Sequence, residues 1–261
     1  MIVDSHCHLN ILPQDKVGTI TEVIERAKTL GVNRMLCVAI NPEQWPEVLA
    51  LADQHSQVYA AIGVHPCEEP NVVVTDEALL KAAAHPKVIA IGEIGLDYFH
   101  FNIQQQDMTW QHDRLRQHVR VAKQLQKPII IHTRHSTPDC LKILKEEGAD
   151  EVGGIMHCFV EDLETAQRAM DLGFYISFSG IVTFKNATDL KAVAQQIPLD
   201  KLLVETDSPY LAPMPYRGKT NQPGYTRYVV EEIAKLREVS FETIAQATTD
   251  NFNRLFKLTA N

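Results

Sequence analysis

The segment VIAIGEIGLD, residues 88–97, is the strongest indication of the fold, because its first four positions are all apolar. A strand exposed to solvent on one side alternates apolar and polar residues, whereas a parallel strand covered by helices stays apolar on both sides. The pattern recurs at residues 129–131, which are all isoleucine. These segments therefore predict a parallel sheet that is buried on both faces.

Short apolar segments of this kind alternate with longer amphipathic stretches along the whole chain. The predicted strands lie at residues 2–8, 34–40, 58–65, 88–97, 128–134, 154–159, 174–181 and 202–207. Helices are predicted at residues 19–30, 75–84, 104–126 and 162–172, with two or three more at residues 225–258. Eight strands alternating with helices predict an α/β fold of the TIM (β/α)8 barrel type, with an open doubly wound sheet as the alternative.

Length and composition agree with one globular unit. The chain has 261 residues, of which 45% are hydrophobic, and no Pro/Gly/Ser-rich linker divides it. We therefore expect residues 1–261 to form a single barrel domain. The net charge of −8 argues against a broad electrostatic surface for nucleic acid, although a local cationic cleft or bound metal ions remain compatible with it.

The cysteines and the N-terminus predict the compartment. Five cysteines form no C-x-x-C pair and are odd in number, which argues against a disulfide framework. Asp4 and His6 interrupt the N-terminus too early for a signal peptide, and no apolar run reaches the length of a membrane span. We expect a cytoplasmic protein with no membrane partner. No segment resembles a heptad interface, so we expect a monomer.

Residues that bind metals in other proteins recur at the ends of the predicted strands. His6 and His8 end the first strand, where positions i and i+2 share a face. Alone, this pair is weak support, because a surface strand with two solvated histidines gives the same pattern. Further residues of this kind end later strands: His65, Glu93, His132, His157 and Asp207.

These strand ends would meet at one rim of a barrel. Burying several imidazoles and two carboxylates together without a cation would be unfavourable, so we predict two divalent cations. One would be held by His6, His8, Glu93 and Asp207, and the other by Glu93, His132 and His157, with Glu93 bridging ions about 3.5–4 Å apart. The ligand types suit Zn²⁺, Mn²⁺, Co²⁺ or Mg²⁺ and do not choose among them.

The last strand supplies the predicted catalytic group. Asp207 is placed to orient an attacking water and accept its proton while it ligates metal. Glu205 lies two residues earlier on the same strand face. It is either a partner that holds a ligand or a charge inside the barrel, or a direct participant in catalysis.

Six short motifs together resemble a known family. They are VDSHCHL (3–9), GVHP (63–66), GEIGLD (92–97), PIIIHTR (128–134), HCF (157–159) and LVETDSPY (203–210). In this order and combination they are similar to the TatD family of metal-dependent hydrolases. The segments FYISFSGIVTF (174–184) and NQP (221–223) resemble most closely its bacterial YcfH-like branch.

The resemblance implies an amidohydrolase-like TIM barrel with two divalent metals that hydrolyses phosphodiester bonds of DNA. It carries metal-ligand roles onto the six residues predicted above, and substrate-phosphate contacts onto His65 and Arg134. An ion pair across the rim is the alternative for Arg134. Two positions depart from the family: His135 replaces the usual acid after Arg134, and Asn10 replaces a common Asp.

The loop after the last strand is a candidate for further substrate contacts. Arg217 is our predicted substrate-binding residue there, and the alternative is a Pro-rich loop with solvated charges. Aromatic and cationic neighbours that could hold bases or phosphates are Phe99, Phe101, Tyr210, Tyr216 and Lys219.

Three functions follow from this pattern. The first is a two-metal deoxyribonuclease that binds DNA weakly and prefers single strands or strand ends. The second is a metal-dependent ester or amide hydrolase with the same site, for example one acting on aminoacylated tRNA. The third is a non-catalytic metal-binding module, which would fit a barrel that had lost a ligand.

Overall fold

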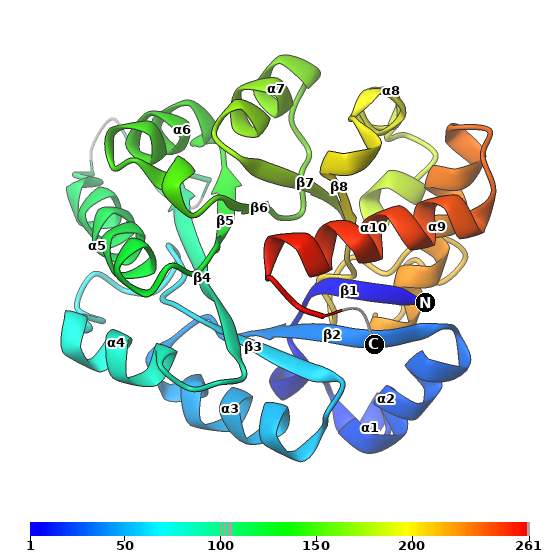
Figure 1. Cartoon of the computed structure of the whole chain (residues 1–261), viewed down its shortest axis with the longest axis horizontal. Helices are drawn as coiled ribbons and strands as arrows, with labels where there is room; N and C mark the ends of the chain where they lie inside the picture. Colours follow the sequence, from blue (N-terminus) through cyan, green and yellow to red (C-terminus); the bar gives the residue numbers. More distant parts are fainter. Residues whose placement is uncertain (100, 102, 104–105, 260–261) are drawn as a thin grey trace.

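The computed structural model describes residues 1–99, 101, 103 and 106–259, and it shows eight parallel strands enclosed by helices (Figure 1). The strands pair in sequence order around the barrel. They are β1 (Ile2–Cys7), β2 (Val32–Val38), β3 (Val58–Ile62), β4 (Val88–Asp97), β5 (Ile129–Arg134), β6 (Gly154–Met156), β7 (Phe174–Phe178) and β8 (Leu202–Val204). The predicted TIM barrel is confirmed, and the doubly wound alternative is wrong because this strand order has no reversal point.

Helices follow most strands and cover the outside of the barrel (Figure 1). The α-helices are α1 (Gln14–Val17), α2 (Ile20–Thr29), α3 (Trp45–Gln54), α4 (Asp76–Ala83), α5 (Thr109–Leu125), α6 (Thr137–Glu146), α7 (Leu163–Asp171), α8 (Thr188–Gln196), α9 (Thr226–Leu236) and α10 (Phe241–Leu255). The 3₁₀ helices are η1 (Leu9–Ile11), η2 (Pro42–Gln44), η3 (Ala149–Glu151), η4 (Gly180–Thr183), η5 (Leu199–Lys201) and η6 (Pro223–Tyr225).

Local signals explain where several helices begin. Thr19 caps α2 by accepting a hydrogen bond from the Glu22 N–H, while the Glu22 carboxylate accepts one from the Thr19 N–H. Thr75 and Asp162 cap α4 and α7 with one such bond each, accepted from the Ala78 N–H and the Thr165 N–H, without the reciprocal bond. The predicted helix at 104–126 begins at Thr109 in the part of the chain that the structure describes, and its expected start at residues 104–105 lies outside that part.

Apolar side chains from all eight strands form one buried cluster inside the barrel. These residues are Val3, Leu36, Val38, Ala61, Ala90, Ile130, Ile155, Tyr175 and Leu203. Helix α10 closes the N-terminal end of the barrel, where Phe252 packs against this interior cluster (Figure 1). The Asn251 side chain on the same helix donates hydrogen bonds to the carbonyls of Leu199 and Leu202 at the start of β8. The functional rim is therefore left open at the other end.

Several strands end earlier than the sequence pattern predicted. β3 ends at Ile62 rather than residue 65, β6 at Met156 rather than 159, and β7 at Phe178 rather than 181. β8 ends at Val204 rather than 207, and Asp207 has a φ of 56°, which a strand cannot contain. After β3 and β6 the apolar pattern continues past the last ladder hydrogen bond because Val64 and Phe159 are buried in the core without belonging to a strand.

Side chains help close the barrel between its first and last strands. An isolated bridge joins Cys7 to Ser208, and the His8 N–H donates to the Ser208 carbonyl at 2.8 Å. Buried Asp4 on β1 accepts a bond from the Thr206 N–H at 2.9 Å and contacts the Thr206 hydroxyl at 2.6 Å. This seam brings the residues that follow β8 against the end of β1.

In the described residues, no helix is both long enough and apolar enough to cross a membrane.

Candidate metal centre

A cavity of about 670 Å³ opens at the C-terminal ends of the strands. The predicted site residues that line it are His8, His65, Glu93, His132, Arg134, His157 and Asp207. His6 is fully buried beneath them. The barrel thus brings together all six predicted metal ligands from β1, β4, β5 and the segments after β1, β6 and β8.

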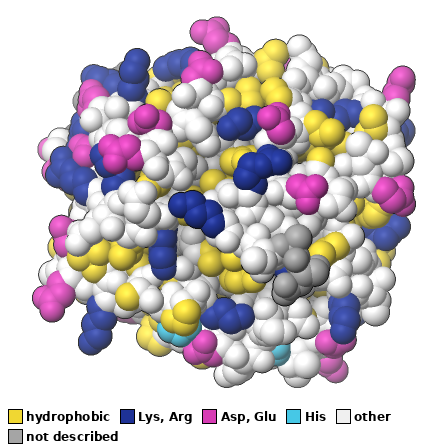
Figure 2. Space-filling view, in the orientation of Figure 1, with side chains coloured by type: hydrophobic (Ala, Val, Ile, Leu, Met, Phe, Trp, Pro, Cys, Tyr) yellow, Lys and Arg dark blue, Asp and Glu magenta, His cyan; other side chains and the backbone are white. Residues whose placement is uncertain are grey.

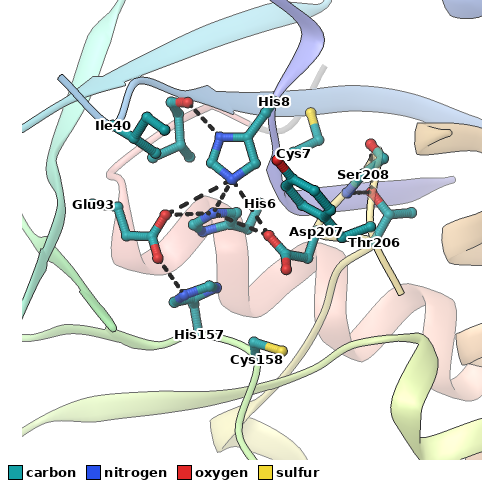
Figure 3. A network of polar contacts seen from close by, with 12 residues as sticks. His6, Cys7, His8, Ile40, Glu93, His157, Cys158, Thr206, Asp207 and Ser208 are labelled. Atoms are coloured by element: carbon teal, nitrogen blue, oxygen red, sulfur yellow. Dashed lines mark hydrogen bonds and ion pairs between the residues drawn. The ribbon is translucent and has the colours of Figure 1, made fainter. Parts of the chain in front are cut away.

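Glu93 lies at the centre of this group, and its two carboxylate oxygens face different histidines (Figure 3). Its Oε1 lies 2.7 Å from His157 Nε2 and 3.1 Å from His132 Nδ1. Its Oε2 lies 3.4 Å from His6 Nε2 and 3.8 Å from His8 Nε2. The carboxylate therefore stands between two groups of imidazoles.

Asp207 completes the group on the β1 side. Its Oδ1 lies 3.4 Å from His8 Nε2 and 3.7 Å from His6 Nε2, and these two nitrogens are 3.3 Å apart. The Asp207 N–H also donates to the His6 carbonyl at 2.9 Å, across the seam of the barrel. A ligand that follows the last strand is thereby fixed against the two from the first.

The donor set fits divalent cations. Three compact groups of ligand atoms occur among the described residues: His6–Glu93–His157, His6–His8–Asp207 and His65–Glu93–His132. Burial acts to raise the pKa of Glu93, but the imidazoles of His157 and His65 outweigh it and hold that pKa well below its usual range. An anionic carboxylate between imidazole nitrogens is a ligand set that Zn²⁺, Mn²⁺ or Co²⁺ would accept.

In His8 and His157, the ring nitrogen that faces away from Glu93 also has a hydrogen-bond partner. His8 Nδ1 lies 2.7 Å from the Val38 carbonyl, which accepts its proton and leaves Nε2 facing the site. His157 Nδ1 lies 3.3 Å from Glu205 Oε1. Glu205 is fully buried and also accepts a bond from the Cys158 N–H at 2.8 Å. Glu205 thus contacts His157, a predicted ligand, through the ring nitrogen that faces away from Glu93.

Asp97 is a site residue that the sequence reasoning missed. Its Oδ2 lies 2.9 Å from His132 Nε2, on the opposite side of the ring from Glu93. It lies four positions after Glu93 on β4, and both carboxylates contact the ring of His132 on the neighbouring strand β5. Gly95 between them is required, because a Cβ there would lie 1.9 Å from the His132 carbonyl oxygen.

His65 has the geometry of a donor. Its Nδ1 accepts a hydrogen bond from the Cys67 N–H at 3.0 Å, so the neutral ring carries its proton on Nε2. That Nε2 lies 3.3 Å from Glu93 Oε1. A protonated nitrogen cannot ligate a cation but can donate to a substrate oxygen.

Arg134 lies on the cavity wall, positioned by an aromatic ring. Its guanidinium carbon lies 3.6 Å from the centre of the Phe99 ring, and His135 meets the same ring edge-on at 5.3 Å. Arg134 and His135 thus both contact the Phe99 ring. Asn10, the other departure, contacts the Cys37 thiol through its Oδ1 at 3.9 Å.

The candidate substrate contacts in the loop after β8 do not lie together at the cavity. Arg217 lies over the Phe184 ring at 4.3 Å and does not line the described cavity. Tyr216 stacks on Tyr225 at 4.2 Å, and Lys219 lies 6.0 Å from the Tyr216 ring. Tyr210 does line the cavity and is 56% exposed. On the other side of the rim, Phe101 packs edge-on against Trp110 at 5.8 Å.

Known proteins resemble this chain over its whole length. A family model described as TatD related DNase matches residues 3–257. The uncharacterized metal-dependent hydrolase YabD of Bacillus subtilis (strain 168) is 46% identical over 259 residues, 99% of this chain and 100% of its own. The uncharacterized metal-dependent hydrolase YcfH of Escherichia coli (strain K12) is 44% identical over 261 residues, 100% of this chain and 97% of its own. The crystal structure of YJJV, a TatD homologue from Escherichia coli K12, matches with a TM-score of 0.90 at 31% identity and covers 99% of this chain and 98% of that one.

Proposed function

The chain belongs to the TatD related DNase family and is a metal-dependent hydrolase, and from this premise we propose that it is a two-cation deoxyribonuclease. It would hydrolyse phosphodiester bonds of DNA, with a preference for single strands or strand ends. We further propose that residues 1–261 act as one cytoplasmic, monomeric domain.

The observation that carries this proposal is the two-sided contact of Glu93. One oxygen faces His6 and His8, and the other faces His132 and His157. This is the arrangement expected of a carboxylate that bridges two cations about 3.5–4 Å apart. The first cation would be held by His6, His8, Glu93 and Asp207, and the second by Glu93, His132 and His157.

The protein's own residues would divide the work around the scissile phosphate. Bound cations supply Lewis acidity toward a phosphoryl oxygen and favour ionised water at neutral pH. The Asp207 carboxylate, whose pKa is held low against burial by its contact with His8, would orient the attacking water and accept its proton. The His65 Nε2–H and the Arg134 guanidinium would donate to non-bridging phosphate oxygens.

An exposed aromatic ring at the cavity and the net charge of the chain support unpaired, weakly bound substrates. Tyr210 lines the cavity, and its exposed ring offers a surface on which an unpaired base could stack. With a net charge of −8, DNA affinity would depend on the cations and a few basic side chains. We therefore propose weak binding, and we keep Arg217 as a more distant phosphate contact.

A time course of end-labelled DNA cleavage with Mg²⁺, Mn²⁺, Co²⁺ and Zn²⁺ tests this function. We expect metal-dependent shortening of single-stranded DNA that stops on chelation and returns when the cation is restored. RNA and a panel of small esters and amides are run in parallel. If only the esters or amides are turned over, the nuclease proposal is wrong and the alternative substrate class replaces it.

Metal content separates the two-cation proposal from a one-cation site. Elemental analysis of the protein purified without chelator should give two divalent cations per chain. Glu93→Ala should lose both, because the substitution removes a ligand from each. Retention of two cations by this variant would contradict the bridging role.

A further inference from the structure

Helix α5 presents polar side chains to the loop between β3 and α4. Gln111, Arg114 and Gln117 lie on successive turns of one helix face, and each donates hydrogen bonds to backbone carbonyls of that loop. This loop begins with His65 beside the cavity. Helix α5 is therefore joined by several hydrogen bonds to the loop that carries His65.

Gln111 makes the most demanding of these contacts. The residue is completely buried, and its Oε1 accepts a hydrogen bond from the Asp97 N–H at 3.0 Å. Its Nε2 donates to the Pro66 carbonyl at 2.9 Å and to the Asp97 carbonyl at 3.1 Å. A side-chain amide can donate and accept at once without charge, so one residue ties two backbone segments together in the interior.

Both segments lead directly to the metal centre. Asp97 Oδ2 contacts His132 Nε2 at 2.9 Å, and the opposite ring nitrogen of His132 faces Glu93 at 3.1 Å. Pro66 follows His65, whose Nε2 faces the same Glu93 oxygen. We propose that Gln111 is a positioning residue that fixes His132 and His65 relative to Glu93.

The two connections have different consequences. Through Asp97, Gln111 would set the orientation of a cation ligand, and such outer partners change metal affinity by about 10- to 100-fold in other proteins. Through Pro66, it would fix the position of the His65 Nε2–H donor at the cavity wall. The effect through Pro66 on substrate binding, the substrate half of this inference, rests on the proposed function. The effect through Asp97 on cation binding, the cation half, can be measured without substrate.

Arg114 distinguishes the two connections. Its guanidinium donates to the carbonyls of His65, Glu68, Glu69 and Val72 at 2.8–3.2 Å. Among the described residues its hydrogen bonds go to this loop and none goes to Asp97, so Arg114 holds the loop without holding the His132 side. Gln117 binds the far end of the same loop, at the Val74 carbonyl, 2.9 Å away.

The test is the Gln111→Met substitution, which keeps the side-chain length and removes all three hydrogen bonds. The Co²⁺-loaded protein is mixed with a chelator, and the release of each cation is followed by absorption. We expect one of the two cations to leave about tenfold faster than in the unchanged protein, and the other at its normal rate. On single-stranded DNA, KM should rise about tenfold.

Two variants on the same helix serve as matched controls. Arg114→Lys should raise KM while leaving both release rates unchanged, because it loosens the loop alone. Gln117→Met removes a bond of the same type to the same loop and should change neither quantity. If Gln111→Met lowers the melting temperature too far for the assay, Gln111→Glu provides the second variant, because its buried, protonated acid keeps the acceptor for the Asp97 N–H and can donate to only one of the two carbonyls.

The measurements distinguish failure of the Gln111 proposal from failure of the proposed function. Release rates and KM within twofold of the unchanged protein in a folded Gln111 variant would overturn the proposal, as would equal effects of Gln111→Met and Gln117→Met. A protein that releases one cation faster in Gln111→Met, yet cleaves no DNA in any form, would support the cation half and contradict the proposed function instead.

Discussion

At the residue scale, the roles of Glu93 and Asp207 differ because Asp207 contacts one histidine group and Glu93 contacts both. Asp207 faces only His6 and His8, and its φ of 56° turns its carboxylate toward the open cavity. Glu93 lies within β4 and is almost completely buried. Geometry therefore favours Asp207 as the group that meets water and substrate.

The substitution Asp207→Asn should separate chemistry from binding. An amide keeps the size of the side chain but cannot accept a proton, so we expect kcat to fall by about 10²- to 10⁴-fold while KM changes by a few-fold. Steady-state kinetics on single-stranded DNA measure both constants. A raised KM with an unchanged kcat would show that Asp207 only binds substrate.

Tyr210 provides a second residue-scale prediction. If its exposed ring stacks on an unpaired base, Tyr210→Ala should lower kcat/KM on single-stranded DNA by about tenfold, and Tyr210→Phe should not. An oligonucleotide that lacks the base beside the cleaved bond is the control, because both proteins should cleave it equally. A tenfold difference on that substrate as well would rule out stacking.

Residue types were enough to group the candidate ligands, but contacts between strands remained hidden in the sequence. The ending of several strands in His or an acid was sufficient to group His6, Glu93 and Asp207 at one rim. Asp97 was missed because its partner, His132, belongs to another strand and their pairing depends on register. The Arg134 pose was equally hidden, because it depends on a ring contact with Phe99, which follows a different strand.

At the element scale, the seam between β1 and the segment after β8 depends on one buried acid. Burial raises the pKa of Asp4 to about 8, against the opposing bonds from Thr206, so the carboxyl is largely neutral at pH 7. A neutral carboxyl can donate to the Thr206 hydroxyl, which can donate in turn to Ser208. The seam is thus held by an uncharged chain of hydrogen bonds.

Asp4→Asn should therefore be mild, because an amide reproduces the neutral acid as donor and acceptor. We expect the free energy of unfolding at pH 7 to change by less than about 1 kcal/mol, whereas Asp4→Ala should lower it by about 2–4 kcal/mol by leaving buried groups unpaired. Denaturant unfolding measures both variants. An equal loss for Asn and Ala would mean that the carboxylate is charged.

Helix α5 carries an acid-sensitive residue, His118. Burial lowers its pKa to about 4, and its Nδ1 bonds to the Arg114 carbonyl at 2.8 Å. The unfolded chain binds a proton near pH 6.5 and the folded chain does not, so the unfolding free energy falls as pH drops from about 6.5 to 4. Between pH 7 and 4.5 this group should remove about 2–3 kcal/mol.

His118→Gln isolates this effect, because an amide retains an N–H and does not titrate. Urea unfolding at several pH values should give the variant a shallower loss of stability below pH 6.5 than the unchanged protein. Parallel pH dependences would show that His118 is not the source.

Element boundaries were less predictable than element types. Short apolar segments identified all eight strands, but β3, β6, β7 and β8 end before the predicted residue, and Val64 and Phe159 are buried beyond the ends of β3 and β6. Helix starts at Thr19, Thr75 and Asp162 followed the capping rules, since capping depends on neighbours in sequence. Strand ends depend on the adjacent strand, which a single sequence does not display.

At the scale of the whole molecule, charge limits how DNA can be held. The net charge is −8. Figure 2 shows the face covered by α10, on the opposite side of the barrel from the cavity, and there the Lys and Arg side chains are interspersed with Asp and Glu, so this face offers no continuous basic surface. If two or three phosphates are contacted, the logarithm of DNA affinity should fall against the logarithm of salt concentration with a slope of about −2. Titrations of single-stranded DNA between 50 and 200 mM salt measure this slope, and a value steeper than about −5 would indicate an extended binding surface.

The joint contact of His8 and Asp207 has a consequence for chain synthesis. A cation held by both would close a loop of about 200 residues, which is the kind of long-range link that stabilises a chain most by restricting its unfolded state. An incomplete chain that ends before β8 would carry His6 and His8 but lack the carboxylate opposite them. Tight binding of that cation would therefore require that the last strand has been synthesised and has packed against the first.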